Sequence, residues 1–244
     1  MPEATVKKIL QARVYEAAIE TPISPAPFLS RRFNNQILIK REDLQPVYSF
    51  KIRGAYNKMA QLSEEQKARG VIAASAGNHA QGLAMAAKQL GVKAVIVMPR
   101  ITPEIKVQAV RARGARVVLK GDAFDAAAGH AQELVAEHGY TYIPPFDDID
   151  VIAGQGTVAV EILRQHSGPL DAIFVPVGGG GLIAGVAAYV KYLRPDIKVI
   201  GVEAEDSASL KAALAAGRRI TLDQVGVFAE GVAVAQIGKI PFKI

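Results

Sequence analysis

The chain has 244 residues, of which 50% are hydrophobic and 21% are charged, and it contains no cysteine. This composition is typical of a globular protein of one or two domains that buries a real core, and it excludes a disulfide framework and a thiolate zinc site. The net charge of +6 arises from mostly interspersed acids and bases, and the chain has no tryptophan to stack on nucleobases. We therefore expect no nucleic-acid partner.

Two segments bear on targeting and membranes. Lys7 and Lys8 are not followed by an apolar stretch, so we expect no signal peptide and a cytoplasmic protein. The segment 172–190 is uncharged and long enough to resemble a membrane span, but Pro176 and four consecutive glycines would disrupt a helix at its centre. We interpret it as a strand, a glycine loop and a helix, and expect no membrane partner.

Short apolar runs alternate with helical patterns along the chain. Strands are predicted at 37–39, 71–74, 94–98, 116–119, 140–143, 172–177 and 199–202. Helices are predicted at 53–61, 78–90, 103–113, 123–138, 153–165, 182–193 and 207–216. In the third helix Thr102 is the expected cap, Pro103 suits the first turn and Gly114 follows the end. The alternation predicts an α/β fold with mostly parallel sheets and helices on both faces.

The first stretch that carries chemistry is 49–55, at the start of a predicted helix. Its lysine, Lys51, follows Phe50. A lysine that forms a Schiff base must be desolvated near an anionic cofactor, and Phe50 supplies an apolar wall for such a site. An ordinary surface lysine is the alternative interpretation of this stretch by itself.

The stretch 75–82 follows a predicted strand and opens the helix at Asn78. Ser75 and Asn78 are candidate caps for that helix. The functional interpretation is a carboxylate-binding loop, in which helix N–H groups and a hydroxyl converge on an anion. His79 lies in the first turn, where the helix dipole disfavours a protonated imidazole, so we do not expect it to be the catalytic base.

The stretch 144–147 has two prolines that stiffen a loop after a strand, and Thr157 with its neighbouring glycines is expected to open the next helix. We interpret both as turn chemistry. The remaining histidines lie on polar faces or at helix ends without metal-ligand spacing, and are His130, His138 and His166. No metal site is predicted.

The glycine run 178–181 lies between an apolar strand and a helix. Glycines let the backbone approach an anion, and the helix N-terminus adds unpaired N–H groups and the positive end of a dipole. The run predicts a phosphate site, with a flexible turn as the alternative. It is neither a Walker A sequence nor the spaced dinucleotide-binding pattern.

Together and in this order, these stretches resemble the fold-type II pyridoxal-phosphate (PLP) enzymes, which include the tryptophan synthase β subunit, cysteine synthase and serine racemase. Among them the chain is most similar to the biosynthetic threonine dehydratases, through the segments 14–18, 41–56, 74–82 and 202–207. The segment Gln45-Pro46-Val47 ahead of Lys51 resembles the biosynthetic dehydratases more than the catabolic ones. We expect the resemblance to run from about Ile9 to Val234 and to have faded by Gln236.

The resemblance implies roles for particular residues. It makes Lys51 the catalytic residue, which carries PLP as a Schiff base and takes the α-proton of the substrate. The implied cofactor-binding residues are Phe50, Lys51, Asn78, Gly178, Gly179, Gly180, Gly181, Leu182 and Gly231. The implied residues for the substrate carboxylate are Ser75, Ala76, Gly77, Asn78 and His79. Metal-binding relatives place a second acid shortly after the position of Glu203, where this chain has Ser207 and Ser209.

The implied reaction is the dehydration and deamination of L-threonine to 2-oxobutanoate and ammonia, the first step of isoleucine biosynthesis, in a homo-oligomer (dimer or tetramer). The alternatives are a catabolic serine/threonine dehydratase, a serine racemase that takes L-serine, and an inactive PLP-binding fragment. The resemblance implies a large PLP-binding domain of residues 1–54 and 155–244 and a small domain of residues 55–154. It also implies that the C-terminal part of the large domain and a regulatory domain are missing.

Overall fold

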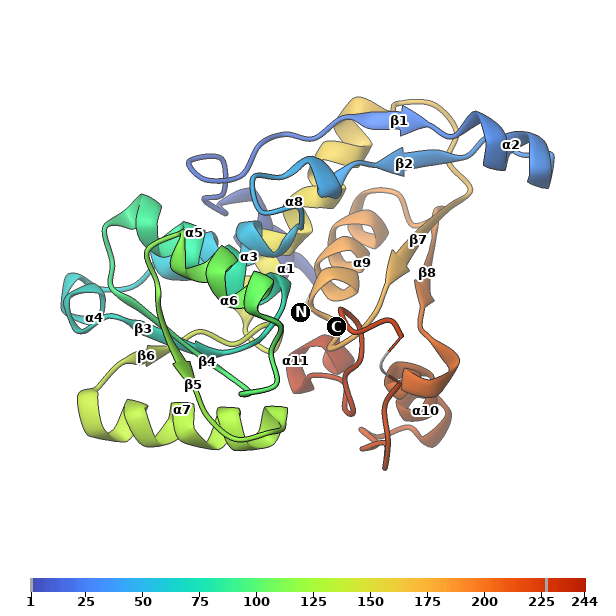
Figure 1. Cartoon of the computed structure of the whole chain (residues 1–244). Coiled ribbons are helices and arrows are strands. Elements are labelled where there is room, and N and C mark those ends of the chain that lie inside the picture. The colour runs from blue at the N-terminus through green and yellow to red at the C-terminus, as the bar shows by residue number, and fades with distance from the viewer. Residues whose placement is uncertain (1, 227) are drawn as a thin grey trace.

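The computed structural model describes residues 2–226 and 228–244. Its largest sheet has four parallel strands in the order β5-β4-β3-β6 (Figure 1). These strands are β3 (Val71–Ala74), β4 (Ala94–Met98), β5 (Arg116–Leu119) and β6 (Thr141–Tyr142). Every residue of β3 and β4 is buried. A central strand covered on both faces is apolar throughout, which is why these segments do not alternate.

Helices cover both faces of this sheet (Figure 1). One face is covered by α3 (Lys51–Ala60), α5 (Asn78–Leu90) and α6 (Glu104–Arg111), and the other by α7 (Phe124–His138). Successive side chains of a strand point to opposite faces. Accordingly Val71 and Ala73 pack with α3 and α5, whereas Ile72 packs with Ala127 and Ala131 of α7.

A second, two-stranded parallel sheet lies beside the first (Figure 1). Its strands are β7 (Ala172–Pro176) and β8 (Lys198–Val202). The helices around it are α1 (Pro2–Leu10), α8 (Ile149–Gln165), α9 (Gly181–Leu193), α10 (Ser209–Ala216), α11 (Lys239–Lys243) and the short 3-10 helix η2 (Glu205–Ser207). The segment 172–190 is thus a strand, a glycine loop and a helix, as predicted. No helix within 2–226 and 228–244 is long and apolar enough to cross a membrane.

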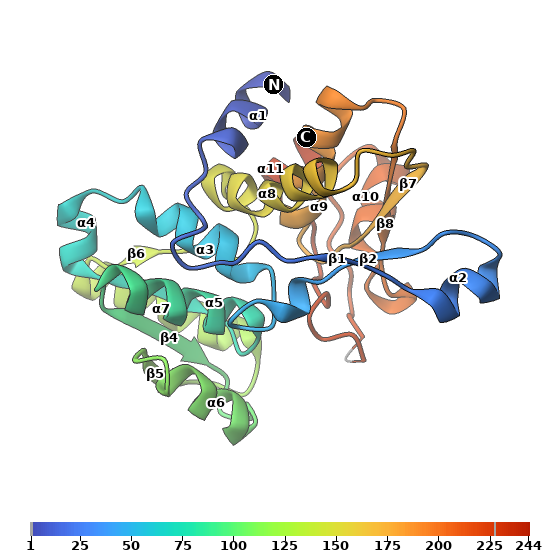
Figure 2. The same cartoon turned by 90° about the horizontal axis from the view of Figure 1, so that it is seen from above.

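An arm formed by an antiparallel strand pair projects from the molecule, with a short helix at its tip (Figures 1 and 2). The arm consists of β1 (Ile23–Pro25), α2 (Pro27–Phe33) and β2 (Leu38–Lys40). The remaining elements are η1 (Glu42–Leu44) and α4 (Glu64–Arg69). The sequence patterns predicted β2 but not β1, α1, α2, α4 or α11, because short or exposed elements carry little hydrophobic periodicity.

Three helices cross at glycines in the middle of the molecule. A Cβ atom on Gly154 of α8 would lie 2.6 Å from the carbonyl oxygen of Arg53 in α3, and one on Gly185 of α9 would lie 2.6 Å from the carbonyl oxygen of Ile152. Only glycine permits backbones to approach so closely. The crossings hold α3, which begins at Lys51, and α9, which begins at Gly181, against α8.

A buried ionic network reinforces the contact between α3 and α8. The guanidinium of Arg53 donates to both oxygens of Glu161 at 2.5 and 2.9 Å and to both oxygens of Glu42 at 2.8 Å. Burial opposes the charge of Arg53, but the hydrogen bonds to the two carboxylates outweigh it and raise the pKa of Arg53. Breaking such a buried pair is costly because it leaves an uncompensated charge.

The predicted α/β architecture is confirmed, but the predictions for the starts of α6 and α8 are wrong. Thr157 does not open a helix: α8 begins at Ile149, where the carboxylate of Asp148 accepts from two N–H groups, and Thr157 lies inside it. Its glycine neighbours serve the helix crossings instead. Thr102 does not cap α6, because Pro103 occupies the cap position and the Thr102 hydroxyl is buried without a partner in the described residues.

The predicted domain boundaries at 54/55 and 154/155 lie inside α3 and α8, two helices packed against each other. The division into a large and a small domain stays a prediction.

Candidate active site

Lys51 is the first residue of α3, directly after the cap residue Phe50. Its Nζ donates to the carbonyl oxygen of Pro145 at 2.9 Å and lies 5.5 Å from the centroid of the Phe50 ring. Burial penalises the charged ammonium and lowers the pKa of Lys51 to about 8. Roughly a tenth of such amines are neutral at pH 7, so Lys51 can act as a nucleophile or a base near neutral pH.

The turn between β3 and α5 presents free N–H groups. Gly77 occupies the cap position of α5 without a side-chain hydrogen bond, so neither Ser75 nor Asn78 caps this helix, contrary to one prediction. Instead, the Ser75 hydroxyl accepts from the Gly77 N–H at 3.3 Å. The N–H groups of Ala76, Asn78 and His79 have no hydrogen-bond partner among the described residues. Such a helix start is suited to a carboxylate.

His79 is buried beside this turn. Its Nε2 lies 2.9 Å from the carbonyl oxygen of Ile143, which makes Nε2 the protonated nitrogen of a neutral ring. Burial, and secondly the charge of Lys51, lower the pKa of His79 to about 3. The imidazole is therefore neutral at pH 7, as expected, although burial rather than the helix dipole is the main cause.

The glycine run follows β7. Gly180, with a left-handed φ of 88°, is the cap residue of α9, and Gly181 is its first residue. Gly179, Gly180 and Gly181 are buried, yet their N–H groups have no partner among the described residues. Unpaired buried N–H groups are rare in proteins, and three in succession at a helix start fit an anion.

The chain's own side chains surround this run. A Cβ atom on Gly179 would lie 2.2 Å from two carbons of the Phe146 ring, and one on Gly181 would lie 3.0 Å from the Phe146 Cβ. On Gly180 it would lie 2.5 Å from Ile237. The run must therefore be glycine for packing as well as for any anion.

The segment 143–147 joins the parts of the site. Ile143 accepts from His79, Pro145 accepts from Lys51, and Phe146 packs on the glycine run. The sequence of 144–147 indicated only turn chemistry, so roles for Ile143, Pro145 and Phe146 were not predicted. The available signal was its place after β6, because the carboxyl ends of neighbouring parallel strands meet at one edge of a sheet.

The remaining residues named from the resemblance lie on α9 and in the segments that follow it. Leu182 is the second residue of α9. Gly231 is exposed in a turn, next to Val232, whose Cα would lie 3.0 Å from a Cβ on Gly178. The carboxylate of Glu203 accepts from the N–H groups of Leu210 and Lys211 at 2.8 and 2.9 Å, at the start of α10. The roles of the individual residues stay predictions.

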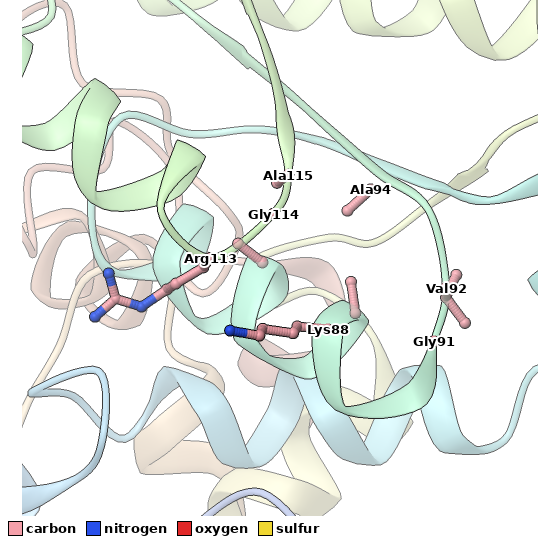
Figure 3. A pocket seen from close by; sticks show the side chains of 9 residues that line it. Lys88, Gly91, Val92, Ala94, Arg113, Gly114 and Ala115 are labelled. Carbon is pink, nitrogen blue, oxygen red and sulfur yellow. The ribbon is translucent and has the colours of Figure 1, made fainter.

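Two cavities lie elsewhere. One of about 150 Å³ is bordered by Lys88, Gly91, Arg113 and Gly114 at the ends of α5 and α6 (Figure 3). Basic side chains at helix C-termini complement the helix dipole, which accounts for Lys88 and Arg113 without a ligand. The other, of about 430 Å³, lies between α1, α9 and α11. Neither contains a predicted site residue, and the free N–H groups near Lys51 define the candidate site better.

Known proteins resemble this chain over nearly all of it. Residues 14–244 match the family described as pyridoxal-phosphate dependent enzyme. The biosynthetic L-threonine dehydratase of Burkholderia multivorans is 58% identical over 242 residues, which are 98% of this chain and 48% of that protein. The chain thus spans about half the length of this relative. The prediction that the resemblance fades by Gln236 is wrong, because the family match continues to Ile244.

Solved structures of related enzymes also have a fold similar to that of this chain. The processed form of threonine deaminase isoform 2 from Solanum lycopersicum superposes with a TM-score of 0.96 and 52% identity, and the match covers 99% of this chain and 70% of that one. Maize serine racemase gives a TM-score of 0.94 at 32% identity, covering 98% of this chain and 72% of that one.

PLP carries a phosphate and an aldehyde, and the residues present fit both. The unpaired N–H groups of the buried glycine run suit a phosphate, and the desolvated amine of Lys51 suits the aldehyde. The free N–H groups at the start of α5 suit the carboxylate of an amino acid. This arrangement and the match over residues 14–244 show that the chain belongs to the family of pyridoxal-phosphate dependent enzymes.

Proposed function

We propose that the protein that contains this chain is a PLP-dependent threonine dehydratase, which converts L-threonine to 2-oxobutanoate and ammonia in isoleucine biosynthesis. The observation that carries the proposal is the 58% identity, along 98% of the chain, to a biosynthetic threonine dehydratase. Serine racemase, one of the two alternatives among enzymes, is represented by a solved structure at 32% identity.

The site residues support this chemistry. PLP, when bound, withdraws electrons from the carbon that loses its proton. The amine of Lys51, with a pKa near 8, takes that proton from the substrate Cα. The N–H groups of Ala76, Asn78 and His79 hold the substrate carboxylate. The glycine run holds the phosphate through its N–H groups.

The test is steady-state turnover by the purified full-length protein with PLP. Formation of 2-oxobutanoate from L-threonine is compared with formation of pyruvate from L-serine and with racemisation of L-serine. We expect kcat/KM to favour threonine. Lys51→Ala should abolish both turnover and the borohydride-stable PLP adduct, whereas Lys88→Ala, remote from the site, should change neither. Racemisation faster than threonine deamination would overturn the proposal.

We also infer that the protein is a cytoplasmic homo-oligomer. The inference rests on resemblance to the family, and light scattering on the purified full-length protein tests its oligomeric part. A monomer at micromolar concentration would contradict it.

A further inference from the structure

Two segments that are far apart in the chain, 143–147 and 237–241, pack against the glycine run. Phe146, in the segment 143–147, packs against Gly179 and Gly181. Ile237 and Pro241 pack against Gly180, where Cβ contacts would measure 2.5 and 2.9 Å. The shape of the run, and with it the direction of its free N–H groups, therefore depends on how these two segments are held together.

One side chain joins the two segments. The carboxylate of Asp147 accepts from the Lys239 N–H through Oδ2 at 2.9 Å and from the Ile240 N–H through Oδ1 at 2.8 Å. Beside it, the Gly238 N–H donates to the carbonyl oxygen of Gly179 at 3.0 Å. Asp147 thus links the segment 143–147, which contacts the glycine run through Phe146, to the segment 237–241, which contacts it through Ile237 and Pro241.

We propose that Asp147 is a positioning residue for the cofactor phosphate, acting through Phe146 on one side of the glycine run and through Ile237 and Pro241 on the other. Both oxygens of its carboxylate are used in hydrogen bonds to the backbone of Lys239 and Ile240. It holds the segments 143–147 and 237–241 at a fixed separation, so that the N–H groups of Gly179, Gly180 and Gly181 point at one anion. The inference rests on PLP as the cofactor of this site.

An ordinary helix cap is the simpler account of Asp147. However, α11 has only five residues, too few to be stable without tertiary support. The two hydrogen bonds therefore dock a segment that would not hold its own shape, and the docked segment is the one that contacts Gly180. A cap would affect stability alone, whereas a positioning residue would also affect the affinity for PLP.

The experiment uses the full-length protein and measures the dissociation constant of PLP by equilibrium dialysis, with the 31P chemical shift of the bound phosphate as a second readout. Asp147→Ala should weaken PLP binding at least about tenfold and shift the 31P resonance. Asp147→Asn keeps one acceptor oxygen and should weaken binding less than about threefold. Ser63→Ala is the matched control, because it removes the capping box of the remote helix α4.

Lys239→Pro removes the hydrogen bond between Asp147 and residue 239 from the backbone side. Proline lacks the N–H that bonds Asp147, but it suits the first position of a helix, and Gly238, with φ −60° and ψ 153°, already has the conformation preferred before proline. We expect this variant to fold and to bind PLP at least about threefold more weakly. Asp147→Ala combined with Lys239→Pro should lose little more than Asp147→Ala alone, because both remove one interaction.

The outcomes separate the two accounts. Weaker binding and a shifted resonance in Asp147→Ala and Lys239→Pro, with affinity in Ser63→Ala within about twofold, support the proposal. Affinity for PLP within about twofold of the unaltered protein in both Asp147→Ala and Lys239→Pro overturns it. An equal loss of affinity in Ser63→Ala also overturns it. If Asp147→Ala does not fold, Lys239→Pro decides the question: a loss of at least about threefold supports the proposal, and affinity within about twofold overturns it. Failure of the unaltered protein to bind PLP would instead overturn the proposed function.

Discussion

At the scale of single residues, burial gives Lys51 and His79 their chemistry. Lys51 keeps a fixed acceptor in Pro145, and desolvation lowers its pKa to about 8. Close by, His79 is held neutral. The pair shows how a lysine becomes reactive near pH 7 without a neighbouring base.

The titration of Lys51 can be measured directly in the PLP-free protein. Acylation requires the neutral amine, so the rate of trace acetylation of Lys51 should be half-maximal near pH 8, compared with about 10.5 for free lysine. Mass spectrometry of peptides after labelling at several pH values provides the profile. A rate that still rises steeply above pH 9 would show that Lys51 is not desolvated.

His79 should make the protein sensitive to acid. Its folded-state pKa is about 3, below the value of about 6.5 in an unfolded chain, so the unfolded state binds its proton first. The contribution to stability is fully present above about pH 6.5 and is lost as the pH falls toward 3. Between pH 7 and pH 5 this loss is about 2 kcal/mol.

His79→Gln removes the titrating group but keeps a donor for Ile143. Urea unfolding at pH 7 and pH 5 should show a pH-dependent loss smaller by about 2 kcal/mol in this variant. An equal loss in both proteins would mean that the pKa of His79 is the same in the folded and unfolded states.

At the scale of elements, glycines decide how closely the helices approach. The crossing of α3 and α8 brings Gly154 against the backbone of Arg53 and Gly54, and Arg53 then reaches Glu161 two turns along α8. Close approach and the ionic network support each other, because the guanidinium reaches Glu161 only when the helices are near. Together they fix the first turn of α3, where Lys51 lies.

Gly154→Ala should therefore destabilise the fold. The added Cβ would lie 2.6 Å from a carbonyl oxygen and 2.7 Å from the Cα of Gly54, so the helices must separate, at a cost of about 1–3 kcal/mol. Gly129 of α7 is the matched control, because a Cβ there meets nothing within 4 Å. Gly129→Ala should stabilise the helix by about 0.5–1 kcal/mol. Urea denaturation of both variants checks the prediction, and an unchanged midpoint for Gly154→Ala would refute it.

At the scale of the whole molecule, the second sheet has an open face. Within residues 2–226 and 228–244 it consists of the strands β7 and β8, and Phe174 and Val202 are 66% and 49% exposed on it. Apolar surface and unpaired strand edges of this kind favour association with other chains and weaken the sheet. The glycine run follows β7 directly, so its position depends on this sheet.

We expect the polypeptide 1–244, made by itself, to deaminate threonine at less than about a tenth of the specific activity of a full-length relative. A tenfold loss is equivalent to about 1.4 kcal/mol in the barrier. Because Lys51, Asn78 and the glycine run are all present, PLP absorbance can persist without turnover. Activity within about tenfold of the relative would show that the open sheet does not limit the site.

The sequence by itself determined the alternation of strands and helices, the parallel sheets and the family. It did so because a buried parallel strand is apolar throughout and because functional loops follow strands. It also pointed to Lys51, the turn 75–79 and the glycine run, since glycines and cap residues at helix starts are local signals. The bounds of β3, β4, β5 and α5 agree with the prediction to the residue.

Only the tertiary structure decided what lies against these stretches. The acceptor of Lys51 is a carbonyl 94 positions away, and Asp147 bonds residues more than 90 positions away. No local pattern encodes such pairs, since they depend on which loops the sheet brings to one edge. For the same reason Thr157 and its glycines were misread as a helix start: the approach of α3 and α9, invisible in the sequence of α8, requires those glycines.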